Sequence, residues 1–135
     1  MSKKLIIHTD GGARGNPGPA GIGAILQDEH GKILAEISRY IGKATNNQAE
    51  YQAVLAAIIK AEQLKAEELD FYLDSELVVK QMNREYKVKD KALASLFVKI
   101  YNQSLKFKKI KFHHISREKN KPADLLANQA MDRGK

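Results

Sequence analysis

The sequence contains no cysteine and no tryptophan, and only three of its 135 residues are proline. Without cysteine the chain can form neither a disulfide framework nor a thiolate metal site. No apolar run approaches the roughly 20 residues that span a bilayer, and residues 1–20 lack the apolar region and cleavage pattern of a secretory signal. We therefore expect a cytoplasmic protein in a reducing compartment that does not associate with a membrane.

The remaining composition is that of an ordinary globular chain, with 43% hydrophobic and 29% charged residues. The length fits one domain, and the sequence has no repeat, low-complexity segment or linker. We therefore expect a single domain over residues 1–135 and a monomeric protein.

The charge is basic overall and unevenly distributed. The net charge of +7 favours a polyanionic partner, and residues 106–121 carry seven Lys or Arg against the single Glu118. A lysine-rich stretch taken alone is more typical of a solvated face. It therefore indicates nucleic-acid binding only beside a site that handles phosphate.

The hydrophobic pattern changes period along the chain and predicts five strands and four helices. Residues 32–41 alternate, with Ile33, Ala35, Ile37 and Ile41 on one drier face, which is typical of an antiparallel strand. The predicted elements are strands at 3–9, 20–28 and 32–41, a helix at 45–66, a strand at 68–74, helices at 75–86 and 91–106, a strand at 109–115 and a helix at 121–132. This order predicts an α/β fold in which three antiparallel strands are followed by parallel strands, with helices on both faces.

Four carboxylates occupy positions where this fold lets them meet. Asp10 ends the first predicted strand and Asp74 the fourth, so both emerge at one sheet edge if those strands are parallel neighbours. Glu50 interrupts the inward stripe of the first helix, and Asp124 lies in the first turn of the last. Strand-end acids also start turns, and a first-turn Asp stabilises a helix dipole. For Asp124 alone this ordinary explanation is the better one.

Four converging acids would repel one another strongly unless cations lay among them. Oxygen ligands without cysteine select Mg²⁺ or Mn²⁺ over zinc. Two Mg²⁺ ions roughly 3.5–4 Å apart are a known means of clamping a phosphodiester for in-line attack by water. The sequence therefore predicts a metal site that acts on phosphate esters.

Four segments together resemble type 1 ribonuclease H over nearly the whole chain: "TDGGARGNPGPAGIGAIL", "TNNQAEYQAVLAAI", "LDSELVVKQM" and "HISREKNKPADLLANQA". The resemblance implies a ribonuclease H-like fold and an endonuclease that hydrolyses the RNA strand of an RNA/DNA hybrid. It implies 5′-phosphate and 3′-hydroxyl products and two Mg²⁺ ions, for which Mn²⁺ can substitute. It places the catalytic, metal-holding quartet on Asp10, Glu50, Asp74 and Asp124.

The resemblance also implies contacts with nucleic acid. An amide can distinguish RNA from DNA at a 2′-hydroxyl, and glycines let a sugar–phosphate chain come close. The residues expected to bind nucleic acid are Gly11, Gly12, Arg14, Asn16, Thr45, Asn46, Gln48 and Lys89. Cap and turn chemistry accounts equally well for Thr45, which matches a phosphate-pocket position, and competes closely for Asn46.

Two further candidates come from the loop before the last helix. His114 precedes Asp124 by ten residues, the offset at which the family often places a histidine that assists protonation or product departure. Here "REKN" follows directly, and the loop lacks the Gly and second His of the longer version. A merely structural imidazole is therefore an equal alternative for His114, and Arg117 is a slightly better candidate for the electrostatic part.

The chain also departs from larger relatives, because it has neither tryptophan nor room for a basic helical protrusion or a separate hybrid-binding domain. This compact form predicts weak, salt-sensitive binding and low processivity. The main alternative function is a non-catalytic or weakly active hybrid- or RNA-binding module of the same fold. Such a module is expected to lose one or more acids, and all four are present.

Other enzyme classes fit less well. Integrases and junction resolvases need added elements, and proofreading exonucleases place a Glu where Gly12 stands. The glycines at 11, 12, 15 and 18 lack the spacing of a dinucleotide-binding loop. The sequence leaves open the preference between Mg²⁺ and Mn²⁺ and the cleavage of double-stranded RNA.

Overall fold

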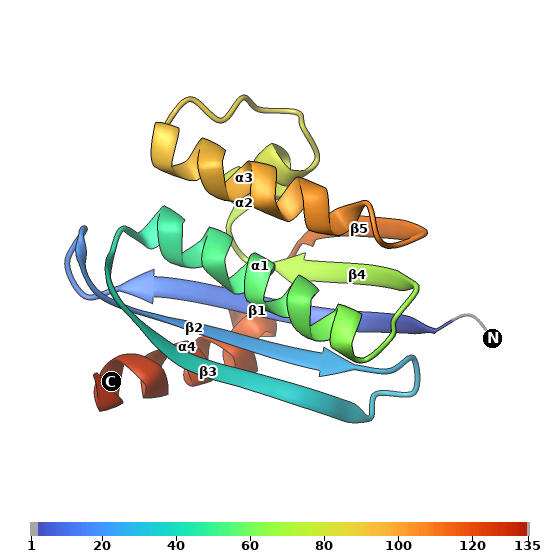
Figure 1. The fold of residues 1–135 in the computed structure, drawn as a ribbon. Helices are drawn as coiled ribbons and strands as arrows, with labels where there is room; N and C mark the ends of the chain where they lie inside the picture. The colour runs from blue at the N-terminus through green and yellow to red at the C-terminus, as the bar shows by residue number, and fades with distance from the viewer. Residues whose placement is uncertain (1–2, 135) are drawn as a thin grey trace.

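The computed structural model describes residues 3–134, which form a mixed five-stranded sheet with helices on both faces (Figure 1). The elements are β1 (Lys4–Ala13), β2 (Gly18–Gln27), β3 (Ile33–Ala44), α1 (Asn46–Gln63), β4 (Glu68–Leu73), α2 (Glu76–Met82), α3 (Lys91–Ser104), β5 (Lys109–His114), the 3-10 turn η1 (Arg117–Asn120) and α4 (Lys121–Arg133). This order confirms the α/β class predicted from the sequence.

The strands lie in the order β3-β2-β1-β4-β5. The β1–β2 and β2–β3 pairs are antiparallel, whereas β4 runs parallel to both β1 and β5. His8 pairs with Tyr72 in the β1–β4 register, so Asp10 and Asp74, each two residues further on, reach the same edge of the sheet. The predicted juxtaposition of these two strands is therefore confirmed.

Two predicted boundaries and the predicted face of one residue are wrong in detail. β1 continues through the glycines to Ala13, because residues 11–13 pair with residues 20–22 of β2, and Asp10 therefore lies inside the strand. Helix α2 ends at Met82 instead of residue 86, because Arg84 adopts a left-handed φ of 62°. Ile33 is 50% exposed instead of lying on a dry face, because the β2–β3 register shifts between Leu26 and Gln27 and interrupts the alternation.

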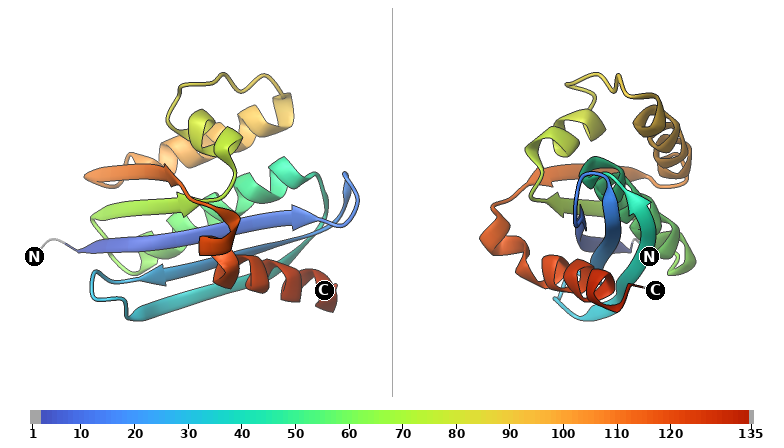
Figure 2. Two further views of the ribbon diagram at one scale, coloured as in Figure 1. Left: turned by 180° about the vertical axis from the view of Figure 1, so that it is seen from behind. Right: turned by 90° about the vertical axis from the view of Figure 1, so that its left-hand side faces the viewer.

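Helices α1 and α4 cover opposite faces of the sheet, as the front and back views show (Figures 1 and 2). Both helices come so close that a side chain on the facing strand would not fit. A Cβ at Gly11 would overlap the backbone of Ala49 in α1, and one at Gly23 would overlap the Ala123 carbonyl in α4. Small residues on both sides of each contact thus place Glu50 and Asp124 against the sheet.

The core lies mainly between α1 and the sheet. Fully buried Val54, Ala57 and Ile58 of α1 pack there with Ile7 and Phe71 of the strands. No helix in residues 3–134 is both long and apolar enough to cross a bilayer.

Candidate active site

Three acids from three elements meet just beyond the last parallel pair of β1 and β4, His8 and Tyr72. Asp10 comes from β1, Glu50 from α1 and Asp74 from the residue after β4, and a carboxylate oxygen of each lies within 4.8 Å of the others. Asp10 and Glu50 are each only 7% exposed. The predicted convergence of these three side chains is therefore present in the fold.

Asp124 lines the same cavity from the first turn of α4, together with Arg14, Arg117 and Asn128. Asn128, one turn further along the helix, donates from Nδ2 to Asp124 Oδ1 at 3.2 Å. The fourth acid thus lines the cavity that holds the other three, and the two arginines supply positive charge at its walls.

The electrostatics of the site oppose the ionisation of Asp10 and Glu50. Burial, with the neighbouring Glu50, Asp74 and Asp124 carboxyls, raises the pKa of Asp10 far above its ordinary value. Burial also raises the pKa of Glu50, although the Gly11 N–H donates to its Oε1 at 3.1 Å and the Arg117 charge acts in the opposite sense. The cluster as it stands therefore favours a proton or a cation among its oxygens.

The residues present fit divalent cations. The donors are all oxygens, which Mg²⁺ and Mn²⁺ prefer. Buried Glu50 Oε2 has no hydrogen-bond partner within the described residues. This oxygen could therefore bind a cation without first losing a hydrogen bond. The carboxylate repulsion that raises the pKa of Asp10 is the repulsion that divalent ions would relieve.

Comparison with known proteins gives the family. Residues 8–130 match the model described as reverse transcriptase-like. The bifunctional protein Rv2228c of Mycobacterium tuberculosis is 45% identical over 130 residues, which cover 96% of this chain and 36% of that protein, so the chain spans only about a third of its length. A ribonuclease H of Prosthecochloris aestuarii is 35% identical over 148 residues, covering 97% of both proteins. The chain belongs to the type 1 ribonuclease H family.

Solved structures of this family superpose closely on the chain. The N-terminal RNase H domain of Rv2228c has a TM-score of 0.96 at 43% identity, covering 98% of this chain and 96% of that chain. LC11-RNase H1 in complex with an RNA/DNA hybrid has a TM-score of 0.91 at 46% identity, covering 96% and 97%. The ribonuclease H-like sheet predicted from the sequence is therefore confirmed.

The residues expected to bind nucleic acid in a ribonuclease H divide into two groups. Gly11, Gly12, Arg14 and Asn46 line the carboxylate cavity. Asn46 is also a structural link, because its Oδ1 accepts from the Ala13 N–H at 2.8 Å and its own N–H donates to Asn16 Oδ1 at 3.0 Å. These bonds hold the β1–β2 loop against the start of α1.

Thr45 and Gln48 form a capping box at the start of α1. Thr45 Oγ1 accepts from the Gln48 N–H at 3.1 Å, and Gln48 Oε1 accepts from the Thr45 N–H at 2.8 Å. The helix-cap alternative for Thr45 is therefore confirmed. Any contact of these two side chains with nucleic acid stays a prediction.

The structure does not bring His114 or Lys89 to the carboxylate cavity, whereas Arg117 lines it. His114 is exposed at the end of β5, and Lys89 is exposed between α2 and α3. The neighbouring His113 stacks on Tyr72, with ring centroids 4.8 Å apart, and its Nε2 lies 3.6 Å from Asp70. If His114 assists product departure or Lys89 binds nucleic acid, each would do so from outside this cavity.

Sequence reasoning missed Asn120, the residue just before α4. Its side chain is fully buried, and its Nδ2 donates to the Thr9 carbonyl at 2.9 Å and to Asp74 Oδ2 at 3.2 Å. Its place four residues before Asp124 reads as an ordinary helix cap, and only the fold reveals these two bonds.

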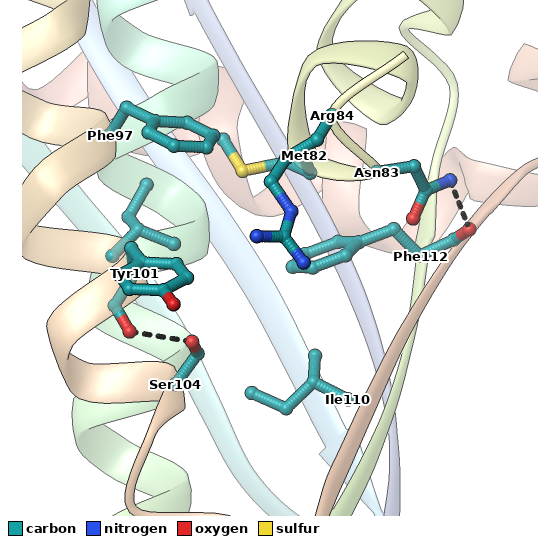
Figure 3. Close-up of a pocket in the computed structure, with 9 residues that line it drawn as sticks. Met82, Asn83, Arg84, Phe97, Tyr101, Ser104, Ile110 and Phe112 are labelled. Atoms are coloured by element: carbon teal, nitrogen blue, oxygen red, sulfur yellow. Dashed lines mark hydrogen bonds between the residues drawn. The ribbon is translucent and has the colours of Figure 1, made fainter.

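A second pocket lies away from the acids, between α2, α3 and β5 (Figure 3). Phe97 and Tyr101 of α3 and Ile110 and Phe112 of β5 line it, and the Arg84 guanidinium reaches in with its Cζ 5.7 Å from the centre of the Tyr101 ring. No carboxylate lines this pocket. It therefore lacks the groups that the chemistry of a ribonuclease H requires.

Proposed function

We propose that this chain is a metal-dependent endonuclease that hydrolyses the RNA strand of RNA/DNA hybrids. The observation that carries the proposal is the group formed by Asp10, Glu50 and Asp74, whose oxygens lie within 4.8 Å of one another, with Asp124 lining the same cavity. Membership of the ribonuclease H family and the superposition on LC11-RNase H1, which was solved with an RNA/DNA hybrid, support it. We also propose that residues 1–135 act as a single domain and a monomer.

The four acids are the proposed metal ligands. Asp10 is buried and lies among the Glu50, Asp74 and Asp124 carboxyls, and it would be a ligand to both ions. Glu50 and Asp74 would hold the ion on the leaving-group side, and Asp124 the ion on the side of the attacking water. When bound, two Mg²⁺ or Mn²⁺ ions supply charge stabilisation for in-line attack by water and for departure of the 3′-oxygen, which leaves a 5′-phosphate and a 3′-hydroxyl.

Other side chains orient the substrate. Arg117 and Arg14 place positive charge at the walls of the cavity, where a scissile phosphate brings negative charge. We propose that Asn16, Asn46 and Gln48 test for the 2′-hydroxyl in the minor groove, since an amide can both donate and accept there. Gly11 and Gly12, Thr45 and Lys89 complete the proposed nucleic-acid contacts, and His114 would assist product departure from outside the cavity.

The assay that tests this function uses labelled RNA/DNA hybrid, RNA duplex and DNA duplex, each with Mg²⁺, Mn²⁺ or a chelator. We expect cleavage of the RNA strand of the hybrid with either metal, 5′-phosphate ends on the products, and no cleavage in chelator. Hybrid binding with no cleavage under any metal would instead favour the binding-module alternative. The RNA duplex in the same assay decides whether double-stranded RNA is also a substrate.

Asp10→Asn is the variant that tests the metal assignment. We expect cleavage to fall below detection while hybrid binding survives, because the substitution removes a shared ligand charge and leaves the fold in place. Gel-shift and cleavage assays on one preparation measure both properties. Glu62→Gln, which removes a partly exposed acid paired with Lys106 far from the cavity, is the matched control and should keep near-normal rates. Near-normal cleavage by Asp10→Asn would refute the assignment.

A further inference from the structure

Asn120 occupies a helix N-cap without using its side chain as a cap. An Asn at this position usually accepts a hydrogen bond from a backbone N–H in the first turn of the helix. Here α4 has no side-chain cap bond, and Pro122 at its start removes one of the N–H groups that would need a partner. The side chain is free to turn inward, and it does so with none of its surface exposed.

The amide of Asn120 joins three elements. Its Nδ2 donates to the Thr9 carbonyl in β1 at 2.9 Å and to Asp74 Oδ2 after β4 at 3.2 Å. Thr9 immediately precedes Asp10, and Asn120 itself stands one helical turn before Asp124. One NH₂ group therefore ties the helix that carries Asp124 to the two strands that carry the other acids of the sheet.

The chemistry of the contacts fixes which end of the amide faces them. Both partners of Nδ2 are acceptors, so a flipped amide would set its own oxygen against two other oxygens. Buried Asn120 Oδ1 has no hydrogen-bond partner within the described residues, and leaving a buried acceptor unpaired costs folding free energy. An apolar side chain that only filled this space would avoid that cost. The Asn120 side chain thus gives up the usual helix-cap bond and instead bonds to Asp74, an acid of the cavity.

We propose that Asn120 is a positioning residue, which holds the Asp74 carboxylate and the first turn of α4 in the arrangement that binds divalent metal. Its bond engages Asp74 Oδ2 and leaves Oδ1 without a contact to this amide. Outer groups that hold a metal-binding carboxylate commonly matter about 10–100-fold to metal affinity or activity. The proposal rests on the proposed function for its kinetic test, but not for its metal-binding test.

The experiment compares Asn120→Ala and Asn120→Asp with wild type. Asn120→Asp keeps the shape of the side chain but turns both donated bonds into contacts between oxygens. Gln81→Ala is the matched control, because it also removes a buried amide, one that is bonded to Tyr51 and does not line the carboxylate cavity. Thermal melting first sets a temperature at which every variant is folded.

The first readout is the affinity for Mg²⁺ without substrate. Calorimetry measures it, and the carboxyl carbon signals of the aspartates in NMR report which side chains respond. We expect Mg²⁺ affinity to fall about 10–100-fold in Asn120→Ala and to stay within about 2-fold of wild type in Gln81→Ala. The second readout is hybrid cleavage at saturating Mg²⁺. We expect kcat to fall at least about 10-fold in both Asn120 variants with KM within about 2-fold.

The outcomes separate the inference from the proposed function. If Asn120→Ala loses thermal stability as Gln81→Ala does, but keeps Mg²⁺ affinity and kcat, Asn120 is only a core residue and the inference is wrong. Normal kcat with tighter Mg²⁺ binding in Asn120→Asp would also overturn the inference. The charge at this position, and not the positioning of Asp74 by the amide, would then determine Mg²⁺ affinity. If wild type cleaves no hybrid, the proposed function fails, and the Mg²⁺ titration still decides the role of Asn120.

Discussion

Asp10 is buried among acids that oppose its ionisation, and this single residue shows why the site needs cations. Its neighbours Glu50, Asp74 and Asp124 all raise its pKa, on top of the effect of burial. A carboxylate kept in such surroundings costs folding free energy unless a proton or a metal compensates it. The burial of Asp10 and Glu50 in such surroundings is therefore consistent with a site that is complete only when metal is bound.

This arrangement predicts a pH-dependent stability cost in metal-free protein. The pKa of Asp10 is higher in the folded protein than in the unfolded chain, so between the two values the folded protein holds a proton that the unfolded chain has released. Stability from this group therefore falls as the pH rises through that window. Asp10→Asn removes the effect and should raise the free energy of unfolding by about 1–2 kcal/mol at pH 8.

Urea unfolding in chelator at pH 8 and near pH 4 measures this difference. We expect the stability gain of Asp10→Asn to shrink toward pH 4, where the wild-type carboxyl is protonated in the folded protein and about half protonated in the unfolded chain. Added Mg²⁺ should stabilise wild type at pH 8 and have little effect on the variant. A lower unfolding midpoint for the variant at pH 8 in chelator would contradict the prediction.

The helices are placed by close backbone contacts with the sheet. α1 approaches β1 at Gly11, and α4 approaches β2 at Gly23, in both cases closer than a Cβ allows. These contacts set the depth at which Glu50 and Asp124 stand relative to Asp10. The glycines of the first hairpin therefore serve packing of the protein itself, in addition to any approach of nucleic acid.

Gly23→Ala should lower the free energy of unfolding by about 3 kcal/mol, because the new methyl group would overlap the Ala123 carbonyl and α4 would have to move. Gly12→Ala is the control. A Cβ there would lie 3.7 Å from the Met131 side chain and 4.0 Å from Asn46 Oδ1, so stability should change by less than about 0.5 kcal/mol. Equal effects of the two substitutions in thermal melts would contradict this account of the helix contact.

The capping box at the start of α1 makes a separate prediction. Thr45→Ala removes the acceptor for the Gln48 N–H and should cost about 1 kcal/mol of stability, whereas Thr45→Ser keeps the acceptor and should cost little. Chemical unfolding of the three proteins measures this. Unchanged stability in Thr45→Ala would show that the cap contributes nothing.

At the scale of the whole molecule, the site depends on a mixed sheet and a basic surface. The parallel β1–β4 pair brings Asp10 and Asp74 to one edge, and helices on opposite faces deliver Glu50 and Asp124 to it. The net charge of +7 suits a polyanionic partner, and Arg14 and Arg117 line the cavity that holds the acids. Substrate binding should therefore be mostly electrostatic.

Salt tests this expectation. The logarithm of KM for hybrid should rise linearly with the logarithm of salt concentration while kcat changes little. Lys89→Gln should reduce the slope by about 1 if Lys89 contacts a phosphate. Lys32→Gln, in the exposed β2–β3 turn, is the control that should leave the slope unchanged. An unchanged slope in Lys89→Gln would remove that residue from the proposed nucleic-acid surface.

Local patterns in the sequence were sufficient to predict the order of the elements and to single out Glu50, whereas the role of Asp124 came from the resemblance to the family. The alternation of hydrophobic residues in strands and their stripes on helices follow from which side chains are buried. That preference belongs to each residue type and can therefore be read from the sequence. Glu50 was detectable because a carboxylate interrupts an otherwise apolar stripe that packs into the core. Asp10 and Asp74 were detectable because strand order constrains where parallel strands end.

Only the tertiary structure decided the contacts between residues distant in the chain. The inward turn of Asn120, the placement of His114 outside the cavity and the closeness of α4 to Gly23 depend on how whole elements pack. A cap-type asparagine, a strand-end histidine and a glycine look the same in sequence whether or not these contacts form. Local preferences determined the elements, and packing of the elements determined which polar groups meet, because a distance between two buried groups belongs to the assembled core and to neither segment alone.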